Sequence, residues 1–191
     1  MRMLTEADRS MHYCLFDTAI GAVGVAWSAH GVTRLQLPES SRAATERRLR
    51  GRPASAFESQ PPPPIERAID AVQRYMTGER VAFSGIKLDL TGVGPFHCSI
   101  YEALRRIGWG ETTTYGALAQ QAGDPGASRA VGQAMGRNPV PVIIPCHRVL
   151  ASGGKAGGFS AFGGTVTKQR LLALEGVHLD GGAPLLPGLL P

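Results

Sequence analysis

Four consecutive prolines at positions 61–64 interrupt the chain and restrict its fold more than any other feature. They end a stretch, residues 52–64, that is rich in Pro, Ser and Ala. Proline has no amide hydrogen to donate and favours extended polyproline geometry, so we predict a connector here. The last proline can begin a helix, which we expect to pack on an N-terminal sheet and to end at Gly78. Its apolar residues recur at helical spacing: Ile65, Ala68, Ile69, Val72 and Met76.

Ahead of the connector, residues 13–37 alternate β-prone segments with glycine-containing turns. This pattern predicts an antiparallel hairpin or meander. Residues 41–50 can form a short basic helix. The part of the chain before the second half is therefore expected to be a small α/β domain, for which we take residues 1–90.

Behind the connector, the pattern changes to short helices. Phe96, Ile100, Leu104 and Ile107 mark one face of a helix that begins near Pro95. Residues 114–122 and 127–137 follow as two further helices around a Gly/Asp/Pro turn, which predicts either a helix-turn-helix or an ordinary helical hairpin. Val131 and Met135 should face Leu118 in the core. Arg129 stands on the other face between the small residues Ser128 and Ala130, which would let the backbone approach a partner closely.

The region after Asn138 contains the most distinctive sequence. Two prolines stop the preceding helix, residues 142–144 read as a short apolar extended run, and Pro145 precedes Cys146-His147-Arg148. Residues 152–164 form a glycine-rich loop. Thr165 can cap a last helix that ends at Gly176. We expect a mostly helical domain over residues 91–176 and a loosely ordered tail over residues 177–191.

Composition excludes several classes of protein. The chain has 191 residues, 43% of them hydrophobic and 18% charged, which suits one ordinary domain or two small ones and excludes large multidomain machinery. Its net charge of +5 slightly favours anionic partners such as nucleic acid. The apolar stretch 19–27 is too short to cross a bilayer, and residues 1–10 are too charged for a signal peptide. We expect no membrane association and a soluble, cytoplasmic protein.

The three cysteines, Cys14, Cys98 and Cys146, form no CxxC pair and no disulfide framework. Closely spaced zinc ligands are missing as well, and His97 beside Cys98 is not a site by itself. These observations favour a reducing compartment and predict no bound metal.

Cys146 is the best candidate for a nucleophile. The thiolate is the reactive form, and neighbouring cations or a base such as His147 lower the pKa of a thiol. The alternative is a buried cysteine that acts as a small hydrophobic residue. Consecutive side chains of an extended chain point to opposite faces, so Cys146 and His147 can cooperate only if the chain turns there or if a water carries the proton.

Two further residues could complete this site. Glu175, in the last turn of a helix, opposes the helix dipole and could instead orient His147. Its alternative is a solvated surface glutamate. Asn138 could bond neighbouring backbone groups and fix the turn before Cys146, or could simply end a helix.

The assembled motifs resemble the O6-alkylguanine-DNA alkyltransferase family, also called methylated-DNA:protein-cysteine methyltransferases. The resemblance covers residues 95–176 and lies in Arg129-Ala-Val-Gly-Gln-Ala-Met135, Asn138-Pro-Val-Pro-Val-Ile-Ile-Pro-Cys-His-Arg-Val149, Gly158-Phe-Ser160 and Leu171-Leu-Ala-Leu-Glu-Gly176. It implies a small ribonuclease-H-like α/β N-terminal domain and a mostly helical C-terminal domain with a helix-turn-helix. It also implies a monomeric, nucleoid-associated DNA repair protein without a cofactor, which binds double-stranded DNA containing O6-alkylguanine.

The resemblance also implies a role for each matching residue. Cys146 would take the alkyl group irreversibly, once per protein, His147 would be the water-mediated base and Glu175 would orient it. Asn138 would brace the turn, and Arg129, flanked by Ser128 and Ala130, would fill the duplex when the nucleotide is extruded. Tyr115 would approach the guanine N3 and the rotated backbone phosphate, and the carbonyl of Val149 and the amide of Ser160 would line the base pocket.

Some features depart from the family pattern or leave alternatives open. Phe159 replaces a common tyrosine, Trp109 replaces a commoner tyrosine or phenylalanine, and residues 160–164 form a slightly longer segment than in some members. The size of the alkyl group accepted and any activity on O4-alkylthymine are therefore open. Two other functions fit parts of the pattern: a lesion sensor that binds DNA without chemistry, and a Cys-His hydrolase.

Overall fold

Three successive strands form the antiparallel meander predicted over residues 13–37. They are β1 (Met11–Thr18), β2 (Gly21–Ser28) and β3 (Gly31–Gln36), and each pairs with the next. The computed structural model describes residues 11–51 and 56–179. The turn into β3 requires glycine, because Gly31 has a φ of 146° and an added Cβ would lie 2.6 Å from the carbonyl oxygen of Lys87.

A fourth strand corrects the prediction of a connector over residues 52–64. β4 (Ala56–Glu58) pairs in parallel with β1, so the strand order is β3-β2-β1-β4. These three residues lie between prolines and keep their own amides, which can join a sheet edge, and the strand they pair with is distant in the sequence. Residues 52–55 lie outside the described part of the chain.

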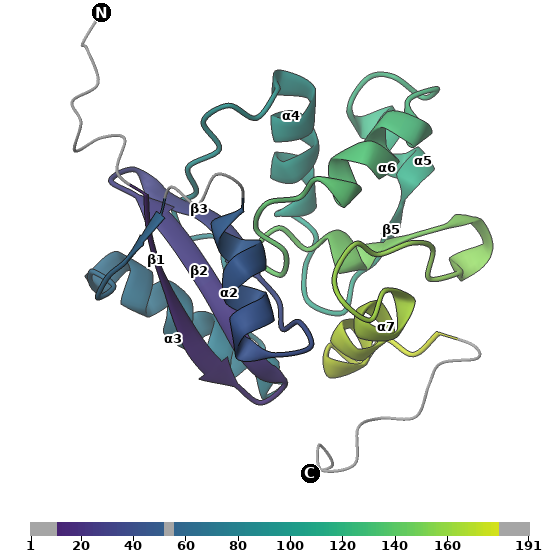
Figure 1. The fold of residues 1–191 in the computed structure, drawn as a ribbon. Helices are drawn as coiled ribbons and strands as arrows, with labels where there is room; N and C mark the ends of the chain where they lie inside the picture. The colour runs from purple at the N-terminus through teal and green to yellow at the C-terminus, as the bar shows by residue number, and fades with distance from the viewer. Residues whose placement is uncertain (1–10, 52–55, 180–191) are drawn as a thin grey trace, which may run out of the picture.

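Two helices cover opposite faces of this sheet (Figure 1). The predicted basic helix is α2 (Arg42–Arg50), and Ser41 caps it by accepting a hydrogen bond from the amide of Ala44. The helix after the prolines is α3 (Pro63–Met76), with two prolines in its first turn as its φ requirement allows. Leu49 of α2 packs with Tyr13 and Ala26, whereas Val72 of α3 packs in the larger core on the other face.

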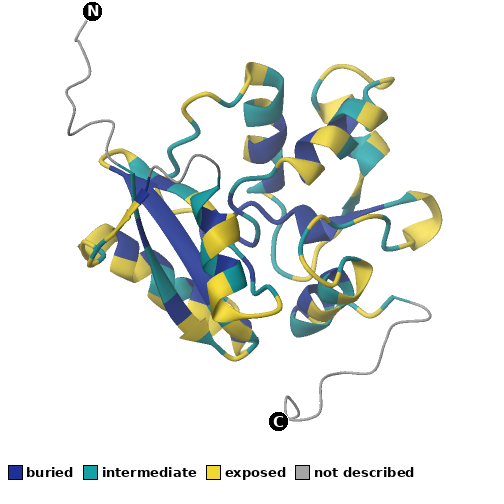
Figure 2. Ribbon diagram, in the orientation of Figure 1, coloured by how far each residue is buried: buried dark blue, intermediate teal, exposed yellow. Residues whose placement is uncertain are grey.

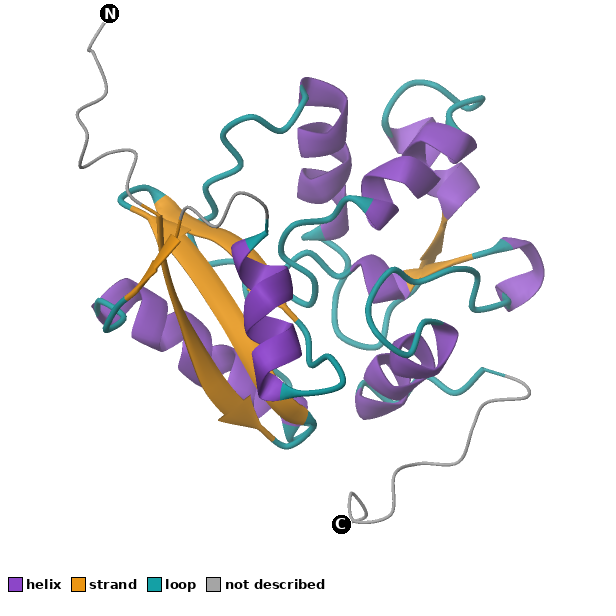
Figure 3. Ribbon diagram, in the orientation of Figure 1, coloured by secondary structure: helices purple, strands orange, loops and turns teal. Residues whose placement is uncertain are grey.

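The second half of the chain is mostly helical, as predicted (Figure 3). It contains α4 (Pro95–Leu104), α5 (Tyr115–Gln121), α6 (Ser128–Gly136) and α7 (Thr165–Leu174), with a short parallel pair formed by β5 (Thr113–Thr114) and β6 (Val149–Leu150). A 3-10 turn, η2 (Ser152–Gly154), lies in the glycine-rich loop. Leu118 and Val131 are fully buried, and Met135 is buried too. The predicted cap of the last helix is wrong: Gly164 takes the cap position, and the hydroxyl of Thr165 donates to the carbonyl of Gly157.

The sheet half and the helical half share one continuous hydrophobic core (Figure 2). A backbone hydrogen bond of 2.9 Å from Leu35 to the carbonyl of Pro139 also joins the sheet edge to the segment before Cys146. The division into residues 1–90 and 91–176 stays a prediction. Residues 180–191 of the predicted tail lie outside the described residues. In the described ranges, no helix has the length and apolar character needed to span a membrane.

Candidate active site

A tight turn precedes Cys146, in place of the extended run predicted for residues 142–144. The amide of Ile144 donates to the carbonyl of Val140 at 2.9 Å, and Val142 has a positive φ of 74°. This conformation is strained for a β-branched residue and costs about 1–3 kcal/mol. The apolar sequence suggested a strand, but the hydrogen bonds of Ile144 go to Val140 and Asn138, which lie outside the run.

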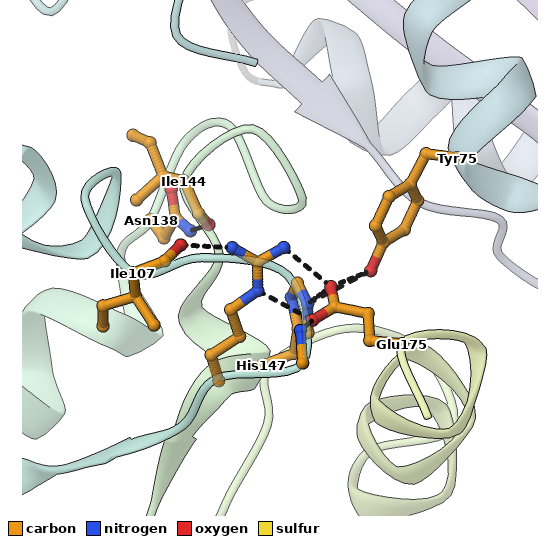
Figure 4. A network of polar contacts seen from close by, with 8 residues as sticks. Tyr75, Ile107, Asn138, Ile144, His147 and Glu175 are labelled. Atoms are coloured by element: carbon orange, nitrogen blue, oxygen red, sulfur yellow. Dashed lines mark hydrogen bonds and ion pairs between the residues drawn. The ribbon is translucent and has the colours of Figure 1, made fainter. Parts of the chain in front are cut away.

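Asn138 supplies two of those bonds, as predicted from its position. Its side-chain nitrogen donates to the carbonyl of Ile144 at 2.8 Å, and its side-chain oxygen accepts from the amide of Val140 at 3.0 Å (Figure 4). The same side chain hydrogen-bonds Cys146. Asn138 therefore ties both ends of the turn to the thiol.

Cys146 begins a 3-10 turn, η1 (Cys146–Arg148), so the chain does turn at the cysteine. The residue is 5% exposed, yet it lines two cavities. A cavity of about 290 Å³ is bounded by Tyr115, Met135, Phe159 and Ser160. A groove of about 400 Å³ extends from Cys146 toward the sheet half. Cys146 is therefore buried but borders two cavities.

The environment of the thiol differs from the one expected. Burial raises the pKa of Cys146, and the hydrogen bond from Asn138, the charge of Lys168 and backbone amides oppose this only in part. The expectation of a lowered pKa is therefore wrong for Cys146. That expectation rested on the positive charges of the two residues that follow Cys146. In the structure, the side chains of His147 and Arg148 both hydrogen-bond Glu175. A base is then needed to take the proton of the thiol.

His147 is placed to be that base. Its Nε2 lies 2.7 Å from Oε1 of Glu175, and both side chains are fully buried (Figure 4). Nδ1 has no hydrogen-bond partner among the described residues. A proton on Nε2, facing the carboxylate, leaves Nδ1 as the basic nitrogen. Burial lowers the pKa of His147 and outweighs the opposing effect of Glu175, so the imidazole is neutral near pH 7. No direct Cys146–His147 hydrogen bond is found in the described structure.

Glu175 is the centre of this network and not the solvated glutamate of the alternative interpretation. Arg148 donates to both of its oxygens, Nε at 2.8 Å and Nη2 at 2.9 Å, and the amide of Gly110 donates at 3.2 Å. Burial alone would raise the pKa of Glu175, but the hydrogen bonds from His147, Arg148 and Tyr75 lower it to about 2. The carboxylate is ionised throughout the neutral range.

The structure brings only some of the remaining predicted residues to the cavities beside Cys146. Ser128, Arg129 and Ala130 form the first turn of α6, with Arg129 exposed. Tyr115 begins α5 and, like the exposed Ser160, lines the smaller cavity. Val149 is fully buried, and its carbonyl accepts from Lys168.

Two functional candidates, Lys168 and Tyr75, escaped the sequence reasoning, and Arg148 was considered only as a cation beside the thiol. Lys168 is fully buried in α7, and its ammonium donates to the carbonyl of Val149 at 2.5 Å and to that of Gly158 at 3.5 Å. Burial lowers the pKa of Lys168 to about 8. Arg148 pairs with Glu175, and Tyr75 reaches the same carboxylate from α3. Only Arg148 carried a signal, since it follows His147 directly in the sequence.

The described residues contain no group of three or more His, Cys, Asp or Glu side chains that could hold a metal ion. The functional groups gathered around Cys146 are instead a base, a carboxylate and cations. This arrangement can remove a proton from a thiol and direct the sulfur into a cavity.

Comparisons with known proteins agree with this geometry. Residues 95–177 match the family model described as 6-O-methylguanine DNA methyltransferase, DNA binding domain. The chain is 36% identical to the methylated-DNA–protein-cysteine methyltransferase of Mycobacterium tuberculosis over 86% of this chain and 92% of that one. The corresponding protein of Methanothermobacter thermautotrophicus is also 36% identical, over 83% of this chain and 82% of that one.

Solved structures give the same result. The crystal structure of Mycobacterium tuberculosis OGT in complex with DNA is similar with a TM-score of 0.70 at 35% identity, covering 88% of this chain and 96% of that chain. The O6-methylguanine-DNA methyltransferase from Pyrococcus kodakaraensis has a TM-score of 0.65 at 28% identity, covering 88% of this chain and all of that chain. The chain therefore belongs to the methylated-DNA–protein-cysteine methyltransferase family.

Proposed function

We propose that this protein repairs DNA by transferring an alkyl group from O6 of guanine to Cys146, once and irreversibly. The observation that carries the proposal is a buried cysteine that opens onto a cavity, two residues from a bidentate Arg148–Glu175 pair and next to a neutral histidine. The Mycobacterium tuberculosis relative, one structure of which is a complex with DNA, shares this family and fold.

The reaction begins with loss of the proton of Cys146. Nδ1 of His147 accepts it through a water, and Glu175 stabilises the imidazolium that forms. The sulfur then attacks the alkyl carbon in line, the carbon–O6 bond breaks, and its electron pair stays on guanine. A hydrogen bond or proton from Tyr115 meets the developing charge at N3. The product is a thioether, a poor leaving group, so the protein is not regenerated.

Access to the lesion requires the nucleotide to leave the helix. An O6-alkyl group inside stacked duplex DNA is out of reach of a buried thiol, so the base must be flipped out at a cost of a few kcal/mol. We assign α5 and α6 as a helix-turn-helix, with Ser128 and Ala130 allowing close approach to the minor groove and Arg129 filling the gap. The sheet half is assigned a ribonuclease-H-like fold.

The flipped guanine would occupy the smaller cavity, against Tyr115 and the amide of Ser160. The carbonyl of Val149, which Lys168 already holds, would accept from the base. Because Cys146 also borders the larger groove, a substituent larger than methyl has space beside the sulfur. We expect the protein to act as a monomer on duplex DNA without a cofactor.

A stoichiometric labelling experiment tests the proposed function. An oligonucleotide duplex that carries radiolabelled O6-methylguanine should leave label on Cys146, rising to one equivalent per protein and then stopping. Peptide mapping by mass spectrometry identifies the labelled residue. Tight binding of the lesion without a mass increment would support a sensor instead, and continued turnover of a small ester or peptide would support a hydrolase.

Replacement of Arg129 by alanine should slow repair of duplex DNA much more than transfer from the free base. The exposed side chain offsets the stacking lost on extrusion, so its removal leaves the chemistry intact. We expect the single-turnover rate on duplex to fall about tenfold, corresponding to about 1.4 kcal/mol. Arg170→Ala, an exposed arginine on α7, is the matched control. Equal slowing on free O6-alkylguanine would contradict the assignment.

A further inference from the structure

Tyr75 is a tyrosine of the sheet half that reaches the site of the helical half. It lies in the last turn of α3 and is fully buried, with its ring 5.6 Å from Phe83 and 5.5 Å from Trp109. Its hydroxyl donates to Oε1 of Glu175 at 2.7 Å and lies 3.1 Å from Nε2 of His147 (Figure 4). These partners are 100 and 72 residues away in sequence.

The hydrogen-bonding roles follow from chemistry. A hydroxyl has one proton, and that of Tyr75 is given to the carboxylate, which can only accept. The oxygen of Tyr75 can then only accept from His147. Oε1 of Glu175, 2.7 Å from Nε2, also only accepts. Both neighbours of Nε2 therefore require a proton on that nitrogen, and the other tautomer would face two acceptors with a lone pair.

We propose that Tyr75 is a positioning residue of the transfer reaction. Together with Glu175 it holds the Nε2–H of His147, and by sharing that carboxylate it limits how strongly Glu175 acts on the imidazole, whose Nδ1 is the basic nitrogen. This inference rests on the proposed function only for its catalytic consequence. Tyr75 does not touch the thiol or the substrate cavity, and it acts through His147. The sheet half thus contributes to the chemistry through one hydroxyl group.

The charged groups around His147 determine how the hydroxyl of Tyr75 affects the pKa of the imidazole. Glu175 favours the imidazolium, whereas Arg148, beside the same carboxylate, and Lys168 of α7 oppose it. Cys146 precedes His147 in η1, and Phe83 and Trp109 add no charge. By donating to Glu175, Tyr75 draws negative charge away from the imidazole. Loss of that hydrogen bond should let the carboxylate stabilise the imidazolium more strongly.

Tyr75→Phe tests the proposal because it removes only the hydroxyl. The pKa of His147 should rise, since the hydrogen bond that Tyr75 donates to the carboxylate is lost. Protonation removes the base, so the acid limb of the single-turnover rate on O6-methylguanine DNA should move to higher pH by the same amount. The rate at pH 6 should fall more than the rate at pH 8.

Tyr13→Phe is the matched control. Tyr13 is also buried in the sheet half and donates to a glutamate, Glu46, at 2.6 Å, but on the other face of the sheet. It should lose similar stability and keep the wild-type pH profile. A slowing of Tyr75→Phe that is uniform with pH, or a shift shared by both variants, would overturn the proposal.

A measurement without DNA separates this proposal from the proposed function. The ring-nitrogen NMR shifts of the protein labelled with 15N-histidine, assigned with His147→Gln, report the tautomer and pKa of His147. We expect one Nε2-protonated form in both proteins, because Glu175 still faces Nε2 in Tyr75→Phe, and a raised pKa of His147 in the variant. Identical spectra and titrations would overturn the role of Tyr75. A wild type that accepts no label would instead refute the proposed function and leave this result valid.

Discussion

Replacement of Cys146 by alanine should abolish alkyl transfer completely, while the affinity for duplex DNA that contains O6-methylguanine stays within about twofold. The thiol forms the new bond, and the other two cysteines cannot replace it. Loss of a nucleophile costs up to about 10⁶-fold in rate, which places the variant below detection in a stoichiometric assay. The first turn of α6, to which we assign the DNA contacts, does not depend on the sulfur. Binding is measured by fluorescence anisotropy and transfer by the mass increment of the intact protein.

Cys98→Ala is the control for this prediction. Cys98 is half-buried, and its thiol contacts the carbonyl of Val93 at 3.6 Å, with no role in the site. This variant should take one alkyl group at the wild-type rate. An increment on Cys146→Ala, or loss of lesion binding by that variant while it stays folded, would contradict the assignment of the nucleophile and the separation of binding from chemistry.

Replacement of Glu175 by glutamine should have the largest effect on stability and also slow transfer at least a hundredfold. The carboxylate compensates the charge of Arg148, which is only 6% exposed. An amide of equal size leaves that charge unpaired, and breaking a buried pair in this way costs about 3–5 kcal/mol. The thermal midpoint should fall by about 10 °C. His147 also loses the group that stabilises its charged form, which accounts for the slower transfer.

The pH dependence gives this prediction a sharper test. Because the pKa of Glu175 is lowered to about 2, its contribution to stability is present above its ordinary pKa of 4.5 and is lost as the pH falls toward 2. The stability difference between the wild type and Glu175→Gln should therefore be full at pH 7 and shrink below about pH 4. Glu39→Gln, which breaks an ion pair with the exposed Arg48, should change stability by less than about 1 kcal/mol. A constant difference across pH would argue against a charge effect.

The sequence predicted those helices, strands and turns that are determined by interactions between residues close together in the chain. The apolar spacing and closing glycines of α3, the glycine turns of the meander and the Ser41 cap all act within a turn or two of the backbone. The helices on either side of residues 123–126 followed from the same kind of pattern. β4 was missed because its pairing with β1 depends on a segment more than forty residues away.

The site also contains features that the sequence predicted and features that it did not. The Cys146-His147-Arg148 motif and the positions of Asn138 and Glu175 could be recognised in the sequence, because the motif is contiguous and its helix ends are marked by proline and glycine. The ionisation of the Cys146 thiol could not be predicted from the sequence. It depends on how deeply Cys146 is buried and on Lys168, an α7 residue with no local signal.

The amino-acid sequence by itself determined the family and most of the secondary structure and singled out Cys146 as the candidate nucleophile, since these rest on short-range patterns. Only the tertiary structure decided that Val142 adopts a strained turn, that Glu175 binds Arg148 with both oxygens, and that Tyr75 of the sheet half shares the carboxylate with His147. Hydrogen bonds and burial act through space, and residues 100 positions apart become neighbours only when the core that both halves share is formed.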